Sequence, residues 1–104
     1  MNREDLLKRV KNAVHELEPG AEIILHGSRS RNDEDAESDW DFVVLVDGHV
    51  TDERTDAIRH RLYEIEWECG EVLCSIVRNR EEWDSPCCQS TPFHQNVKRE
   101  GMAL

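Results

Sequence analysis

The sequence has 104 residues, which suits one domain spanning residues 1–104 with a single hydrophobic core. Hydrophobic residues make up 38% of the chain, charged residues make up 35%, and the formal net charge is −10. So acidic a chain is repelled by the phosphate backbone of nucleic acids, so we do not expect it to bind nucleic acid. No apolar run approaches the length of a membrane span, so we do not expect a membrane-embedded segment either. The charged N-terminus lacks the apolar core of a signal peptide, so we expect a cytoplasmic location.

The first half of the chain predicts one helix followed by two strands. Residues 4–18 carry apolar side chains at steps of three and four, the period of an amphipathic helix, and a Pro-Gly pair follows. Residues 21–26 form a short apolar run that predicts a strand, and residues 32–38 are acidic and turn-forming. Residues 40–46 predict a second strand that is covered on both faces, because apolar residues follow Asp41 without a break.

The second half predicts a helix, a hairpin and two more helical segments. Thr51 is placed to cap a second helix. From Tyr63 to Glu68, apolar and acidic residues alternate, and this period of two predicts a strand. A turn at Cys69-Gly70 is expected to join this strand to another at residues 71–77. The last expected elements are helical, at residues 80–83 and 92–100. The fold class is therefore α/β (α+β), a mixed sheet of about four strands with helices mainly on one face.

The most informative segment joins a Gly-Ser pair to two aspartates. Ten residues separate Gly27-Ser28 from Asp39-Trp40-Asp41. The two aspartates are two positions apart, so in a strand their side chains point to the same face. Two carboxylates on one face offer oxygen ligands to a divalent cation such as Mg²⁺, and without a cation their repulsion is costly. We therefore predict Asp39 and Asp41 as metal ligands and catalytic residues.

Residues beside the Gly-Ser pair are suited to binding phosphate. Gly27 allows a close approach of the backbone, and the hydroxyl of Ser28 and the N–H groups that follow it can hold phosphate oxygens. Arg29 and Arg31 can neutralise a triphosphate. The alternative interpretation of Asp39 and Asp41 is a solvated acidic loop, since residues 33–41 hold six acids. The alternative for Arg29 and Arg31 is that they only balance the charge of this loop.

This segment resembles the signature of the minimal nucleotidyltransferases of the DNA polymerase beta superfamily. The resemblance rests on Gly27-Ser28, Asp39 and Asp41 with their spacing, and covers roughly residues 5–80. It implies a nucleotidyltransferase palm that uses Mg²⁺ and a nucleoside triphosphate, with ATP as the expected donor and AMP as the transferred group. It also implies an acceptor hydroxyl to which the AMP is transferred. In some members this hydroxyl belongs to an all-helical HEPN-type protein, the partner in a toxin–antitoxin couple.

One departure from the family concerns a third aspartate, which members often carry on a later strand. Alignment puts Ser75 at this position, and Glu71 or Glu68 could replace it from another register. The vacancy leaves a second hypothesis open: a weak or inactive antitoxin that neutralises a HEPN-type partner by covering it. A third hypothesis is adenylylation of a small molecule such as an antibiotic. So short a chain would need a homodimer or a partner to enclose that acceptor.

Overall fold

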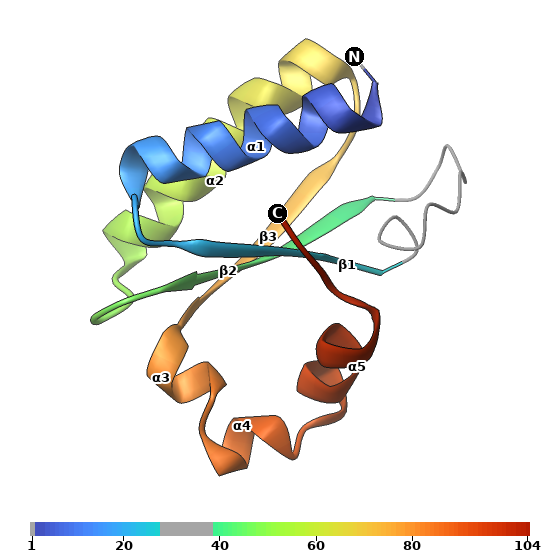
Figure 1. Ribbon diagram of the computed structural model, residues 1–104. Helices are drawn as coiled ribbons and strands as arrows, with labels where there is room; N and C mark the ends of the chain where they lie inside the picture. Colours follow the sequence, from blue (N-terminus) through green and yellow to red (C-terminus); the bar gives the residue numbers. More distant parts are fainter. Residues whose placement is uncertain (1, 28–38) are drawn as a thin grey trace.

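The computed structural model describes residues 2–27 and 39–104, in which helices lie on both sides of a four-stranded sheet (Figure 1). The sheet has the order β3-β2-β1-β4, with β2 and β3 parallel and the other neighbours antiparallel, so the expected mixed sheet is confirmed. In the described residues, no helix is long and apolar enough to span a membrane. The elements are α1 (Arg3–Leu17), β1 (Glu22–His26), β2 (Trp40–Val46), α2 (Asp52–Cys69), β3 (Leu73–Asn79), α3 (Arg80–Trp83), α4 (Pro86–Gln89), α5 (Pro92–Glu100) and β4 (Met102–Ala103).

The two long helices, α1 and α2, cover one face of the sheet (Figure 1). Each begins at a side-chain cap. The Asn2 side chain accepts a hydrogen bond from the Asp5 backbone N–H, and the Thr51 hydroxyl accepts one from the Arg54 backbone N–H. Both helices bury an apolar stripe against alternate residues of β2, so the amphipathic pattern of residues 4–18 and the Thr51 cap are confirmed. The β2 residues on this face are Trp40, Phe42, Val44 and Val46.

The opposite face of the sheet carries the three short helices (Figure 1). Val43 and Leu45 of β2 form a second, smaller core there with Trp83 of α3 and Val97 of α5. Residues Phe42–Val46 are therefore all buried, which confirms that β2 is a central strand covered on both faces. The helical segments expected at residues 80–83 and 92–100 are also confirmed.

The expected strand at residues 63–68 is wrong, because these residues continue α2. Ile58, Leu62 and Ile65 recur at helical spacing and are buried against the sheet, whereas Tyr63 and Trp67 are exposed. Packing of this stripe outweighs the local alternation of apolar and acidic residues. The sheet takes its fourth strand from β4 at the end of the chain.

The expected hairpin is also wrong, because Gly70 ends α2 rather than joining two antiparallel strands. Its φ of 71° is left-handed, and its N–H donates to the Glu66 carbonyl, as in a helix C-terminal cap. The chain then enters β3 parallel to β2, with α2 as the crossover connection. This crossover determines which β3 residues lie beside Asp41.

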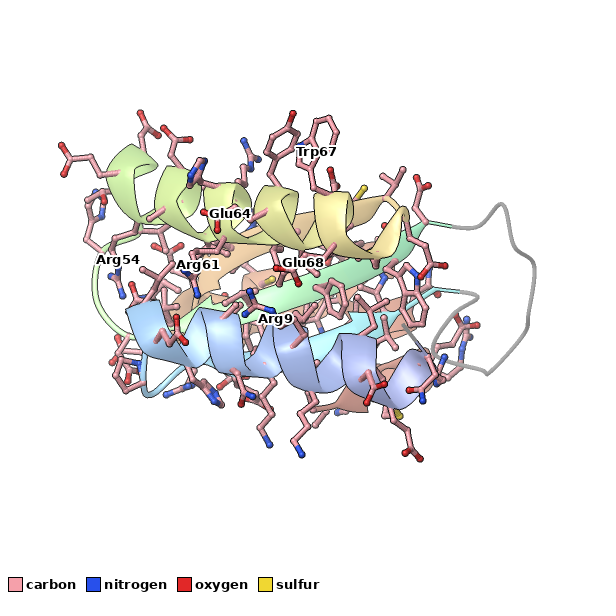
Figure 2. All side chains as sticks on the ribbon, turned by 90° about the horizontal axis from the view of Figure 1, so that it is seen from above. Arg9, Arg54, Arg61, Glu64, Trp67 and Glu68 are labelled. Carbon is pink, nitrogen blue, oxygen red and sulfur yellow. The ribbon has the colours of Figure 1, made fainter. Side chains whose placement is uncertain are left out.

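Three ion pairs join α1 and its C-terminal turn to α2. Figure 2 shows Arg9 and Glu68, the partners of one pair, between the two helices. Arg54 donates two hydrogen bonds to the carboxylate of Glu18, at 2.7 and 2.9 Å, and both side chains are mostly shielded from solvent. The more exposed pairs are Arg9–Glu68 and Arg61–Glu16. The bidentate Arg54–Glu18 pair is expected to contribute most, because exposed ion pairs are screened by water.

Candidate active site

The end of the sheet where β1 finishes and β2 and β3 begin brings together three chemically active side chains. In the strand register, Asp41 pairs with His26 of β1 and with Cys74 of β3. Directly paired residues of neighbouring strands point to the same face, so His26, Asp41 and Cys74 form a row across the sheet. The row lies on the face opposite α1 and α2, because Trp40 and Phe42 point toward those helices.

Gly27 lies directly against the carboxylate of Asp41. Its φ is 81°, and a Cβ added to it would lie 3.1 Å from Asp41 Oδ2. Both the left-handed backbone and this close approach favour glycine at this position. The motif requires the strands at residues 21–26 and 40–46 to be neighbours, so that the Gly-Ser pair and the aspartates face one ligand. The pairing of β1 with β2 meets this requirement and brings Gly27 beside Asp41. Ser28, Arg29 and Arg31 lie outside the described residues.

The electrostatics around Asp41 favour a cation. Burial raises the pKa of the half-buried Asp41 carboxyl above its ordinary value, His26 opposes this shift, and Asp39 adds to it. Asp39 is exposed and close enough for the two carboxylates to repel each other. Such a pair fits Mg²⁺, which is commonly held by one or two carboxylates while phosphate and water oxygens complete its shell. Within the described residues, no group of three or more His, Cys, Asp or Glu side chains is placed to hold a metal.

The position beside Asp41 on β3 belongs to Cys74 rather than to Ser75. Ser75 pairs with Phe42 and therefore faces the α1–α2 side of the sheet, so the alignment of Ser75 with the third aspartate is wrong in this register. Burial raises the pKa of the Cys74 thiol, and the negative charges of Asp41 and Asp39 raise it further. At neutral pH the third position therefore carries a neutral thiol in place of a carboxylate.

The glutamates considered as substitutes differ in position. Glu68 pairs with Arg9 between α1 and α2, which is the other side of the sheet from Asp41 (Figure 2). Glu71 lies just before β3, on the segment that leads to Leu73. A third acid, Glu66, accepts a hydrogen bond from the Leu73 backbone N–H at 2.9 Å and so holds the start of β3 against α2.

His26 and Phe93 form the side of this site toward α5. Their rings meet edge to face with centroids 5.5 Å apart. Among the described residues, the Nε2 atom of His26 is buried without a hydrogen-bond partner. The sequence favours a packed strand histidine at this position, and the ring contact agrees with that reading. The local sequence gives no signal that Phe93 belongs to the site, because nothing in it shows that α5 reaches the end of β1.

The comparison with known families agrees with this geometry. A family model described as Nucleotidyltransferase domain matches residues 7–94. The chain belongs to this nucleotidyltransferase family. The match begins within α1 and ends within α5, so it includes Gly27, Asp39 and Asp41. No curated protein matches the chain.

Proposed function

We propose that the chain transfers AMP from ATP to an acceptor hydroxyl in a Mg²⁺-dependent reaction. The observation that carries the proposal is the contact between Gly27 and the Asp41 carboxylate, with Asp39 beside it. This contact places a backbone able to approach phosphate next to the two acids that suit a cation. In the reaction, the acceptor oxygen forms a bond to the α-phosphorus while the bond from that phosphorus to pyrophosphate breaks.

Each residue of the site then has a distinct task. Asp39 and Asp41 hold Mg²⁺, which supplies charge neutralisation for the triphosphate and for the departing pyrophosphate. Gly27 lets the chain approach the phosphates, and Ser28, Arg29 and Arg31 bind their oxygens. Catalysis of this kind depends mainly on positioning and electrostatics, so the site needs no covalent protein intermediate.

A second candidate function is a binding module that neutralises a HEPN-type partner with little or no transfer. The observation in its favour is Cys74, a neutral thiol beside Asp41 where a third carboxylate would strengthen the metal site. Two aspartates suffice to bind nucleotide and metal, whereas efficient transfer also needs a well-held acceptor. The two candidates therefore share the ligand site and differ in turnover.

The test is incubation with Mg²⁺ and ATP labelled on the α-phosphate, with and without the protein encoded by the adjacent gene. Labelled product and released pyrophosphate support transfer, and they should disappear in the variant with Asp39→Asn and Asp41→Asn. A matched control is Glu81→Gln with Glu82→Gln, which removes two exposed acids from α3. Nucleotide binding without product supports the second candidate, and the absence of nucleotide binding contradicts the proposed transfer.

A further inference from the structure

Phe93 is an exposed aromatic residue at the edge of the candidate active site. It is 38% exposed, although it lies in the first turn of α5, a helix that packs against the sheet. Its ring contacts the ring of His26, which precedes Gly27 in the chain and pairs with Asp41 across the sheet. Phe93 therefore presents apolar ring surface beside the residues proposed to hold the triphosphate.

Two neighbouring rings hold the Phe93 ring in place. The His26 ring meets it with centroids 5.5 Å apart and planes at 87°, and the Trp83 ring meets it at 5.9 Å and 83°. Both contacts are edge to face, so neither neighbour is stacked in parallel on the phenyl ring. Trp83 is itself buried in the smaller core on this face of the sheet. A ring fixed in this way loses little conformational entropy when a flat ligand binds against it.

The other aromatic residues of the chain are excluded from this site by their positions. The sequence contains three tryptophans, two phenylalanines and one tyrosine, and residues 28–38 contain none of them. Three of the six are buried: Trp40, Phe42 and Trp83. Tyr63 and Trp67 are exposed on α2, which covers the opposite face of the sheet (Figure 1). An aromatic contact with a ligand at this site therefore has to come from Phe93.

We propose that Phe93 binds the base of the nucleotide by stacking against it. This inference rests on the proposed function, in which Gly27 and the two aspartates of the motif hold the phosphates and the metal. The ribose separates the phosphates from the base, so the surface that binds the base has to lie a short distance from the metal site. Phe93 meets this requirement, because it contacts His26 and His26 in turn pairs with Asp41. Every nucleobase has a flat π face that can stack on an aromatic ring.

Stacking on Phe93 predicts a preference among ligands that share the same phosphates. A purine covers more of the phenyl ring than a pyrimidine does, so the contribution of Phe93 should be larger for ATP than for CTP. Inorganic tripolyphosphate has no base, so its binding should not depend on Phe93 at all. The difference in affinity between ATP and tripolyphosphate therefore measures the contact with the base separately from the contacts with phosphate and metal.

The test is calorimetric titration of the chain with ATP, CTP and inorganic tripolyphosphate in the presence of Mg²⁺. Phe93→Leu keeps an apolar side chain but removes the flat ring, so it should weaken ATP binding roughly tenfold, weaken CTP binding less and leave tripolyphosphate binding unchanged. Phe93→Tyr retains the ring and should bind ATP as the wild type does. Trp67→Leu is the matched control, because it removes an exposed ring from α2 and should leave all three affinities unchanged (Figure 2). Thermal melts check that each variant remains folded.

The outcomes distinguish a failure of this inference from a failure of the proposed function. If the wild type binds tripolyphosphate and Phe93→Leu binds ATP as tightly as the wild type, the phosphate site stands and the contact with the base is wrong. An equal loss of ATP and tripolyphosphate binding in Phe93→Leu also contradicts the inference, because Phe93 then supports the shape of the site rather than the base. If the wild type binds neither ATP nor tripolyphosphate, the proposed function fails and the inference fails with it.

Discussion

Gly27 and Asp41 lie against each other at the end of the sheet, with little room for a methyl group between them. A Cβ on Gly27 would lie 3.1 Å from Asp41 Oδ2, and the glycine has a φ of 81°. The contact joins two parts of the motif that lie 14 positions apart in the sequence, 41 minus 27. It follows that a substitution at Gly27 should affect both the backbone and the carboxylate of the site.

Gly27→Ala is expected to lower stability by about 1–2 kcal/mol and to weaken ATP binding at least tenfold. The first effect comes from a left-handed backbone, and the second from the methyl group displacing the Asp41 carboxylate. Gly70→Ala is the matched control, since Gly70 has a φ of 71° but no atom within 4 Å of its added Cβ. Thermal melts and calorimetric titration separate the effects, and equal losses of ATP binding in both variants would contradict the contact.

Mg²⁺ and ATP together are expected to raise the melting temperature, because a ligand that binds only the native state stabilises it by mass action. At 100 times the dissociation constant, the gain should be about 2.7 kcal/mol. The variant with Asp39→Asn and Asp41→Asn should lose the shift, because it no longer presents charged oxygens to the metal. An undiminished shift in this variant would assign the effect to the general acidic surface.

Cys74→Asp is expected to tighten Mn²⁺ or Mg²⁺ binding, whereas Ser75→Asp is not. The first substitution puts a carboxylate beside Asp41, and the second puts one beside Phe42 on the α1–α2 side of the sheet. Ser75→Asp should also lower stability by roughly 1–3 kcal/mol, because it places a charge at a half-buried position. Metal titration followed by calorimetry checks both variants, and tighter binding in Ser75→Asp would show that the strand register is different.

Glu18→Gln is expected to destabilise the chain at neutral pH and to have little effect at pH 2. The hydrogen bonds from Arg54 lower the pKa of the Glu18 carboxyl in the folded chain. A carboxyl with a lowered folded pKa contributes stability above its unfolded pKa, and this contribution is lost as the pH falls through the folded pKa. The loss at pH 7 should be about 1 kcal/mol after allowance for partial exposure.

Urea unfolding of the wild type and Glu18→Gln across this pH range provides the measurement. Glu53→Gln serves as the control, because Glu53 is an exposed acid in the first turn of α2. If the free energies of unfolding of wild type and Glu18→Gln differ by the same amount at every pH, the Arg54–Glu18 ion pair does not cause the pH dependence of stability. The comparison therefore tests the link between α2 and the turn after α1.

The sequence by itself determined the elements in which the local pattern of apolar and capping residues favours the same structure as packing in the folded chain. The apolar period of α1, the continuous apolar run of β2, and the Thr51 cap each predicted what the structure shows. The Gly-Ser and Asp-x-Asp motif likewise predicted that its two strands are neighbours, and β1 and β2 do pair in the sheet.

Tertiary structure decided the course of α2 and the residue that stands beside Asp41. Residues 63–68 suit a strand by their alternation and a helix by the spacing of Leu62 and Ile65, and only packing against the sheet selects the helix. The end of α2 then determines the register of β3. Because a strand alternates its faces at every residue, a shift of one position exchanges Ser75 for Cys74 beside Asp41.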